Sequence, residues 1–431
     1  MTRILVVARW YPAHDDPVRG VFVADQVGAL LGAGVEAVVA SFENHYLSRE
    51  ARQRAAEERA YRGAMALALA RPDAAVVPPP GSGLPPAPVA RLPVMIPAPR
   101  EPLTEGSTHA EALAAFAVAA HSRRPFDLLH AHTGYPDGAA AAAAAGRLGV
   151  PYAITEHSRG LDAIFADEAL RARYAAAAAG GRLLAVSGPL ADRIRAALPG
   201  IELEVVPNAV PLAGFPFRDA AQRESAELLF VGSRRATTGV DSKGIDVLFE
   251  AFALVRRGSA AAGRPRPDLA LRLVGGARPE DDAAWRALAG RLGIGDAVRL
   301  EPAARRDEVA AAMARATLFV HASPWETFGV VVAEALATGL PVVTTRSGGP
   351  EEILGATRSE GPESLPGGEL APRNDPPALA EAIERALGRV ERAGFDRAAM
   401  RRDALARFDA AAVAVQLRAI YAEMTGRGAG S

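Results

Sequence analysis

Two carboxylates stand in an almost wholly apolar stretch, SPWETFGVVVAEALATGLPVVTT at residues 323–345, with seven residues between Glu326 and Glu334. A helix that is apolar on every face is a buried helix, and a buried carboxylate requires a partner. On one straight helix the two residues would lie about 12 Å apart along the axis, too far to act as an acid and base pair. We therefore place Glu326 on a loop and Glu334 in the helix that follows it.

A carboxylate that faces two neighbouring hydroxyl groups can accept a hydrogen bond from each. This geometry suits a ribose at Glu334 and a hexose at Glu326, so the pair predicts one extended ligand. The same residues also admit a structural interpretation, in which Glu334 pairs with a core arginine and Glu326 is a solvated loop charge. The spacing alone leaves both interpretations open.

Fixed positive charges follow the strand-like segment 228–231. Gly232 ends that segment, Arg234 and Arg235 come directly after it, and Lys243 lies further along the chain. Cations beside a glycine that admits close approach of the backbone suit a diphosphate.

Two further positions could contact the same ligand. Thr327, Phe328 and Gly329 should form a helix N-terminus, where free N–H groups and the helix dipole favour an anion. Gly275 follows the strand-like segment 271–274 and begins a tight turn. That turn is either a ligand contact or plain structure.

The order of elements predicts an α/β protein. Short apolar, β-branched runs alternate with helical stretches, which is typical of parallel sheets covered on both faces. The predicted strands of the first half are 4–7, 35–41, 93–96, 127–132, 152–155, 183–186 and 203–206, and those of the second half are 228–231, 271–274, 298–300, 318–320 and 342–344. In such sheets, ligands bind beyond the carboxyl ends of the strands.

We expect two doubly wound, Rossmann-like domains that face each other across a cleft. The pattern restarts after Pro211, so residues 1–211 form an N-terminal domain that binds the acceptor. Residues 225–405 form a C-terminal domain that binds the donor. Residues 406–425 form a last helix that packs back on the N-terminal domain. The Pro-rich segment 71–100 is expected to be a long loop.

Composition excludes several classes of protein. The 431 residues are 49% hydrophobic and 23% charged, with a formal net charge of −1 and a pI near 6.7, so nucleic acid is a poor candidate partner. The chain has no cysteine and hence no disulfide or thiolate chemistry. The apolar stretch 4–8 is too short for a signal peptide, so we expect a cytoplasmic protein. In the arginine-rich helix near 49–62, interspersed glutamates favour a solvated face, and peripheral contact with the inner face of the membrane stays open.

The E-x7-E block closely resembles the signature of glycosyltransferase family 4, whose members are retaining nucleotide-sugar enzymes with the GT-B fold. Weaker similarities follow in the family's order along nearly the whole chain: WYPAHDDPVRGVFVADQ at 10–26, DLLHAHTGYPDG at 127–138, VPNAV at 206–210, VGSRR at 231–235 and SGGPEEI at 347–353.

The resemblance implies a role for each matching residue. Glu334 would bind the donor ribose and Glu326 the transferred sugar, and Arg234 with Lys243 would neutralise the diphosphate. Phe328 and Gly329 would donate backbone N–H groups near the sugar and phosphate, Gly20 would lie near the phosphates, and His132 would contact the donor sugar. Thr327, Gly232 and Gly275 are further candidate donor contacts from their positions in the sequence. Structural alternatives remain for His132, as a hydrogen-bonded loop residue, and for Gly20, as a turn. More residues separate the arginines from Lys243 than in the family pattern. The sequence therefore does not decide whether Arg234 or Arg235 binds the diphosphate.

The activity implied is transfer of a sugar from a nucleoside-diphosphate sugar to a hydroxyl of a carbohydrate, lipid-linked or small-molecule acceptor, with retention of configuration. The pathway would be glycan, polysaccharide or glycolipid biosynthesis. A GT-B phosphorylase or epimerase and a non-catalytic nucleotide-sugar binding protein are the alternatives. The chain contains no Asp-x-Asp triplet, so we expect neither a metal nor another cofactor.

Overall fold

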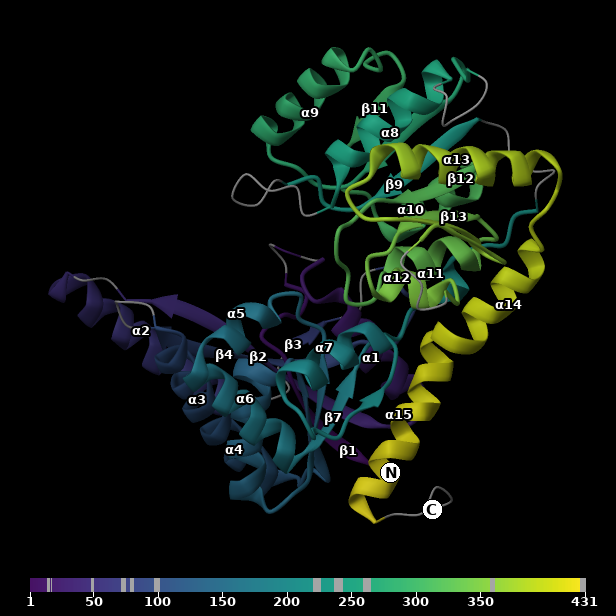
Figure 1. The fold of residues 1–431 in the computed structure, drawn as a ribbon. Helices are drawn as coiled ribbons and strands as arrows, with labels where there is room; N and C mark the ends of the chain where they lie inside the picture. The colour runs from purple at the N-terminus through teal and green to yellow at the C-terminus, as the bar shows by residue number, and fades with distance from the viewer. Residues whose placement is uncertain are drawn as a thin grey trace. The chain divides into compact units, whose positions relative to one another are not determined.

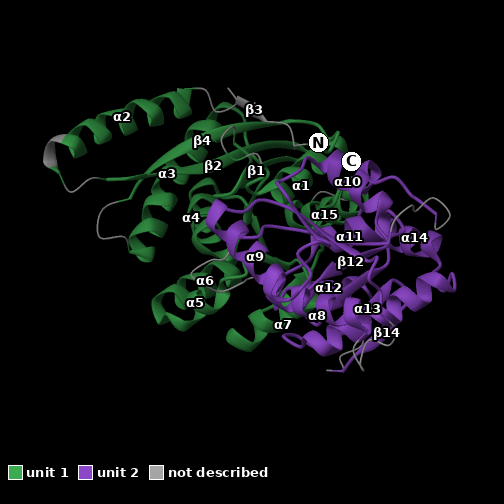
Figure 2. Ribbon diagram, turned by 90° about the horizontal axis from the view of Figure 1, so that it is seen from above, with its two compact units in different colours: residues 1–211, 410–431 green, residues 212–409 purple. Residues whose placement is uncertain are grey.

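The computed structural model describes residues 1–13, 16, 18–47, 50–70, 75–77, 81–96, 101–219, 226–235, 243–258, 265–356 and 361–426. The chain divides into two compact units (Figure 2). Unit 1 comprises residues 1–211 and 410–431, and unit 2 comprises residues 212–409. The last helix therefore belongs to the unit that the N-terminal half forms.

Unit 1 is built on an eight-stranded sheet in the order β3-β4-β2-β1-β5-β6-β7-β8 (Figure 1). All neighbours pair in parallel except β3, which is antiparallel to β4. The strands are β1 (Arg3–Val7), β2 (Glu36–Tyr46), β3 (Ala75–Val77), β4 (Ala87–Ile96), β5 (Leu128–His132), β6 (Tyr152–Glu156), β7 (Arg182–Ala185) and β8 (Glu204–Val205). The helices are α1 (Val21–Gly32), α2 (Ala51–Ala70), α3 (Pro102–Arg123), the π-helix η1 (Gly134–Gly138), α4 (Ala139–Leu148), α5 (Leu161–Ala166), α6 (Glu168–Gly180), α7 (Gly188–Ala197) and α15 (Ala410–Thr425).

Unit 2 is built on a seven-stranded sheet in the order β11-β10-β9-β12-β13-β15-β14, parallel except for β14 against β15. Its strands are β9 (Glu227–Val231), β10 (Ala270–Val274), β11 (Val298–Glu301), β12 (Leu318–His321), β13 (Val342–Thr345), β14 (Glu363–Leu365) and β15 (Gly368–Ala371). Its helices are η2 (Leu212–Gly214), α8 (Ile245–Arg257), α9 (Pro279–Arg291), α10 (Arg306–Arg315), α11 (Val330–Ala337), α12 (Gly349–Ile353), α13 (Pro376–Glu391) and α14 (Arg397–Phe408). The predicted pair of doubly wound α/β domains is confirmed.

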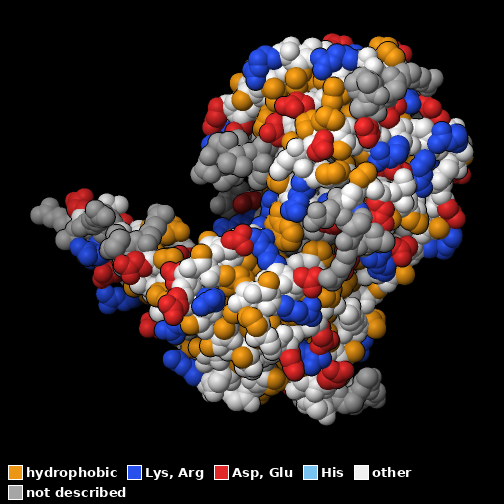
Figure 3. Space-filling model, in the orientation of Figure 1, with side chains coloured by type: hydrophobic (Ala, Val, Ile, Leu, Met, Phe, Trp, Pro, Cys, Tyr) orange, Lys and Arg blue, Asp and Glu red, His pale blue; other side chains and the backbone are white. Residues whose placement is uncertain are grey.

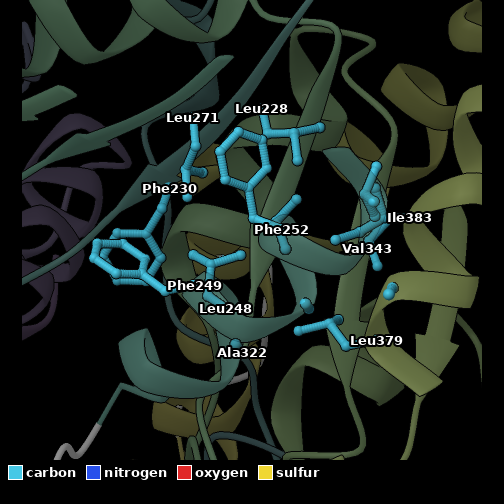
Figure 4. Close-up of a cluster of buried hydrophobic side chains, with 14 of the residues drawn as sticks. Leu228, Phe230, Leu248, Phe249, Phe252, Leu271, Ala322, Val343, Leu379 and Ile383 are labelled. Carbon is cyan, nitrogen blue, oxygen red and sulfur yellow. The ribbon is translucent and has the colours of Figure 1, made fainter. Parts of the chain in front are cut away.

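The core of unit 2 shows why α8 forms and where it packs. Its apolar residues Ile245, Leu248, Phe249, Phe252 and Val255 recur at helical spacing and are fully buried. They belong to one cluster with residues of β9 and β10 (Figure 4). This packing fixes the start of α8, and with it Lys243, against the sheet.

One segment differs from the sequence prediction. The Pro-rich stretch 71–100 is not a long loop throughout, because residues 87–96 form β4 and pair with eight residues of β2. Val89, Leu92 and Val94 of this strand are buried. Pairing and burial thus override the low strand propensity of its prolines. Residues 71–74, 78–80 and 97–100 lie outside the described part.

Helix α2 extends away from the body of unit 1 (Figure 1). It carries charges of both signs, including an i,i+4 pair between Arg62 and Glu58 at 3.7 Å. On the face drawn in Figure 3, acidic and basic side chains are interspersed over the described surface. Among the described helices, none is long and apolar enough to cross a bilayer.

Each sheet reverses its strand order at one point. In unit 1 the chain moves from β1 to β2 on one side and to β5 on the other, and in unit 2 β9 lies between β10 and β12. The carboxyl ends of β1 and β5, and those of β9 and β12, are therefore the expected ligand positions.

Asp137 joins the two loops at the reversal point of unit 1. It lies in η1 after β5, it is fully buried, and its Oδ2 accepts a hydrogen bond of 3.0 Å from the backbone N–H of Arg9 after β1. Burial raises the pKa of the Asp137 carboxyl to about 7, Arg9 opposes this shift and Glu156 adds to it. The carboxyl is thus a pH-sensitive connection between the two loops.

We predict that Asp137 makes unit 1 less stable as the pH rises from 4 to 7. Because its pKa is higher in the folded state than in the unfolded state, the folded state binds the extra proton in this range. The free energy of unfolding should then fall by up to about 1.4 kcal/mol per pH unit from this group. Asp137→Asn keeps the oxygen that accepts from Arg9 but cannot titrate. Urea midpoints measured from pH 4 to pH 7 should therefore shift in favour of the variant as the pH rises.

The matched control is Asp192→Asn, at a side chain that is 45% exposed. Its stability profile should run parallel to that of the wild type. A parallel profile for Asp137→Asn as well would contradict the prediction, because it would show that folding does not raise the pKa of this carboxyl.

Candidate functional site

The reversal point of unit 2 holds an ion pair between two predicted site residues. Lys243, just before α8, forms a salt bridge through its Nζ with Oε1 of Glu326, after β12. The same carboxylate oxygen lies 3.2 Å from Oγ of Ser323 and 3.7 Å from Nε2 of His321. A cation, a carboxylate, a hydroxyl and an imidazole therefore meet where ligands bind in this type of sheet.

Close backbone packing positions Lys243. Gly244, the residue before α8, has the left-handed conformation (φ 68°), and a Cβ there would lie 2.1 Å from the carbonyl oxygen of Ala322. Only glycine fits this approach without displacing the backbone after β12. The first residue of α8 is thereby held against the end of β12, and Lys243 is held beside Glu326.

Glu326 lies on a loop with a fixed backbone. Its N–H donates to the carbonyl of Ser347 at 2.7 Å, and its own carbonyl accepts from the N–H of Gly349 at 3.0 Å. These bonds tie the loop after β12 to the loop after β13, and the Glu326 side chain is 11% exposed. The carboxylate therefore sits on a rigid support.

Helix α11 starts where the sequence predicted. Thr327 and Phe328 are buried, Gly329 is the N-cap with φ 100°, and the helix runs over Val330–Ala337. Glu334 is in its interior and is 6% exposed. The structure thus places Glu326 on the loop and Glu334 in the helix, with the N–H groups of the helix start between them in sequence.

The Arg234 side chain is bound to groups within unit 2. It is 1% exposed and points into unit 2, where the guanidinium forms a bidentate pair with Asp282 at 3.0 and 3.2 Å. It also donates to the backbone carbonyls of Leu273, Gly275 and Glu301. These partners use the guanidinium within the unit, so this geometry does not fit a phosphate ligand.

The neighbouring arginine is the exposed one. Arg235 follows directly and is exposed to solvent, and its N–H donates to Oγ of Ser233 at 3.3 Å. Gly232 and Gly275 lie together beneath these residues, since a Cβ on Gly275 (φ 156°) would come within 1.9 Å of the Gly232 carbonyl oxygen. Of the two arginines, Arg235 is therefore the one available to an anion.

The reversal point of unit 1 carries the other two predicted residues. Gly20 is the N-cap of α1 with φ 64°. His132 is the last residue of β5 and is 3% exposed. Its Nδ1 lies 2.9 Å from Nε2 of His157, and its ring stacks on those of His130 and His157.

The three stacked imidazoles are all neutral near pH 7. Burial lowers the pKa of His130 and that of His157 to about 3 each. Burial also lowers the pKa of His132 well below its usual range, and the two neighbouring histidines add to this shift. His132 can therefore form hydrogen bonds with a ligand but brings it no positive charge.

Sequence reasoning missed His321, Ser323 and His157. Each of them lies at, or just beyond, the carboxyl end of a strand. The same strand-end rule selects Lys243 after β9, and it also finds these residues when it is applied to the ends of β6 and β12. Asp137 has no such signal, because the π-helix that holds it is not recognisable from local sequence.

Comparison with known proteins agrees with this architecture. Residues 20–213 match the family model described as Glycosyltransferase Family 4, and residues 225–389 match the one described as Glycosyl transferases group 1. A D-inositol 3-phosphate glycosyltransferase of Frankia alni is 31% identical over 296 residues, which cover 63% of this chain and 68% of that relative.

Two solved structures are similar over almost the whole chain. Sucrose-phosphate synthase from Thermosynechococcus elongatus has a TM-score of 0.69 at 22% identity, covering 99% of this chain and all (100%) of the other. Anabaena HepE in complex with UDP and glucose has a TM-score of 0.66 at 17% identity, covering 98% of this chain and 100% of that structure. At these identities the structures show a shared fold alone. Together with the family matches, they show that the chain is a glycosyltransferase of family 4 with the GT-B fold.

Proposed function

We propose that the chain transfers a glycosyl group from a nucleoside-diphosphate sugar to an acceptor hydroxyl, with retention of the anomeric configuration. The observation that carries this proposal is the Lys243–Glu326 pair beside the start of α11. It combines a fixed cation, free helix N–H groups and a carboxylate, which are the groups that a diphosphate and a sugar need. The HepE complex with UDP and glucose, in a protein of the same fold, supports a donor of this class.

The ion pair suggests how the donor binds. A diphosphate carries more charge than a carboxylate and competes with Glu326 for Lys243. When Lys243 turns to the phosphate, Glu326 is released to accept hydrogen bonds from sugar hydroxyls. Arg235 and the N–H groups at Phe328 and Gly329 add positive potential, and Glu334 accepts from the ribose.

The same groups stabilise the transition state. As the glycosidic bond breaks, negative charge grows on the leaving phosphate and positive charge on the sugar ring. Lys243 and Arg235 stabilise the phosphate, and Glu326 stabilises the sugar. Retention then follows from attack on the face that the phosphate leaves, with a phosphate oxygen taking the proton of the acceptor hydroxyl.

The acceptor is a hydroxyl-bearing carbohydrate or polyol in this proposal. A similar relative is named for transfer to inositol 3-phosphate, and a solved structure of the same fold for sucrose-phosphate synthesis. Small polyol and sugar phosphates are therefore the first acceptors to test, and lipid-linked glycans the second. Nucleotide release from UDP-, GDP- and ADP-sugars should rise when the right acceptor is added. If no combination of donor and acceptor released nucleotide, the result would contradict the proposal that the chain is a transferase.

Glu334→Ala should raise the KM for the donor about 10- to 100-fold. Removing a charged hydrogen-bond partner costs about 1.5–3 kcal/mol, and each 1.4 kcal/mol is tenfold in affinity. Initial rates at varied donor concentration measure the change, and the melting temperature checks the fold. Glu250→Ala, at an exposed glutamate of α8, should change neither. Unchanged donor KM with a large drop in melting temperature would assign Glu334 to the core alone.

Alanine substitutions of the two adjacent arginines should have different effects. Arg235→Ala should lower kcat with little change in melting temperature, because leaving-group charge grows in the transition state. Arg234→Ala should mainly lower stability, by about 1–3 kcal/mol, since it leaves buried carbonyls without donors. Lys243→Ala should resemble Arg235→Ala in kcat. The reverse pattern, in which Arg234→Ala keeps its melting temperature but loses kcat, would assign the diphosphate to Arg234.

Turnover should persist in excess EDTA. Metal-dependent transferases bind Mg²⁺ or Mn²⁺ through closely spaced carboxylates, and this chain has no Asp-x-Asp triplet. Lys243, Arg235 and the start of α11 offset the diphosphate in our proposal. The assay compares initial rates with EDTA alone, with added Mg²⁺ and with added Mn²⁺. Activity that disappears in EDTA and returns with one of these metals would refute metal independence.

A further inference from the structure

Helix α11 is too short to be stable by itself. It has eight residues, and three of them, Val330, Val331 and Val332, are β-branched. Isolated helices shorter than about 12 residues are marginal in water, and β-branched side chains lower helix propensity further. The position of Glu334, in the interior of this helix, is therefore imposed by the elements that pack against α11.

Helix α14 packs against α11 (Figure 1), and two of its arginines bind the backbone at the C-terminal end of α11. Nη1 of Arg401 donates to the carbonyl of Ala337, the last residue of the helix, and Nη1 of Arg397 donates to that of Gly339 at 2.6 Å. The last carbonyls of a helix have no partner within the helix, and its negative dipole end favours a cation. The two arginines thus fix the end of α11.

This contact is close and well supported. Nη1 of Arg401 also donates to the carbonyl of Phe215 at 2.7 Å, and Arg397 is 5% exposed. Gly339 has φ 72°, and a Cβ there would lie 3.1 Å from Cβ of Arg397 and 2.8 Å from the ring of Phe217. Only glycine permits this approach without strain. The end of α11 is therefore held by packed groups and not by mobile surface side chains.

Helix α14 also contacts the other end of α11. The ring of Phe328, just before the N-cap, packs edge to face on that of Phe408, the last residue of α14, with centroids 5.6 Å apart. Both rings are buried. Arg407 lies over the Phe408 ring and donates to the carbonyls of Glu352 at 2.9 Å and Ile353 at 3.1 Å, at the end of α12. One helix therefore supports α11 at both ends.

We propose that Arg401 and Arg397 are positioning residues that hold α11, and through it Glu334, in the geometry that binds the donor. Their guanidinium groups are bound to backbone carbonyls of unit 2, so they act through α11 and not on the donor itself. This inference rests on the proposed function for the role of Glu334. The support of α11 by α14 does not depend on that function.

Hydrogen exchange of the full chain tests the support of α11 without any measurement of activity. In Arg401→Ala, peptides that cover residues 328–340 should exchange about 10-fold faster than in the wild type, because a charged hydrogen-bond donor is lost. Arg401→Lys keeps a cation with N–H donors and should restore most of the protection. Arg402→Ala, at the exposed neighbouring arginine, should exchange like the wild type. Wild-type exchange of α11 in Arg401→Ala would overturn the proposal.

Ile383→Ala separates the support of α11 from a general loss of stability. Ile383 is fully buried in the core cluster of unit 2, which includes none of the described residues of α11 (Figure 4). This variant should lower the melting temperature at least as much as Arg401→Ala. At a temperature where both variants are folded, its donor KM should equal that of the wild type. A donor KM that rises in both variants in proportion to the loss of melting temperature would contradict the positioning role.

A double-mutant cycle tests whether Arg401 acts through Glu334. Arg401→Ala should raise the donor KM about 3- to 10-fold by itself but hardly at all in the Glu334→Ala background, where the displaced carboxylate is already absent. Equal effects in the two backgrounds would overturn positioning through Glu334. Faster exchange of α11 in Arg401→Ala, in a protein whose wild type transfers no sugar, would retain the support of α11 and reject only the proposed function.

Discussion

The central constraint in this protein is the meeting of parallel strand ends at a point where strand order reverses. In unit 2 it brings the residue before α8 next to the residues after β12, and the Lys243–Glu326 ion pair forms there. The close contact between Gly244 and the Ala322 carbonyl makes that meeting possible. Any side chain at residue 244 would push α8 away from the strand end. The Lys243–Glu326 pair depends on this contact.

The sequence predicted most of the architecture because the strands are short, apolar and regularly spaced. It missed β14 and β15, since a Gly-Glu-Leu-Ala strand has no alternation or β-branched run to distinguish it. It also assigned β4 largely to a loop, because its prolines lower local strand propensity, whereas pairing with β2 depends on residues far away in the chain. Local pattern predicts elements well only where it agrees with tertiary pairing.

Local sequence pattern is even less informative about how the site residues are placed. Residue type and spacing identified Glu326, Glu334 and Lys243 as candidates. In the structure, Lys243 pairs with Glu326 at the reversal point of unit 2, and Glu334 lies in the interior of α11. Nothing in the local sequence separates Arg234 from Arg235. The difference arises from Asp282, which lies 48 positions away in sequence from Arg234 and pairs with it inside the unit. The burial of one of two adjacent, identical residues thus depends on a partner that is distant in the sequence.

The division of the chain has a practical consequence for work on separate halves. Unit 2 is one continuous segment, but unit 1 is assembled from two segments that flank it. Helix α15 contributes Val413, Leu417 and Tyr421 to the core of unit 1, and Tyr421 is hydrogen-bonded to His130. A fragment that stops at Pro211 would therefore lack the helix that completes the hydrophobic core of unit 1. An isolated unit 1 requires residue 410 to be fused to the chain through a linker, or a circular permutation that makes the two segments contiguous.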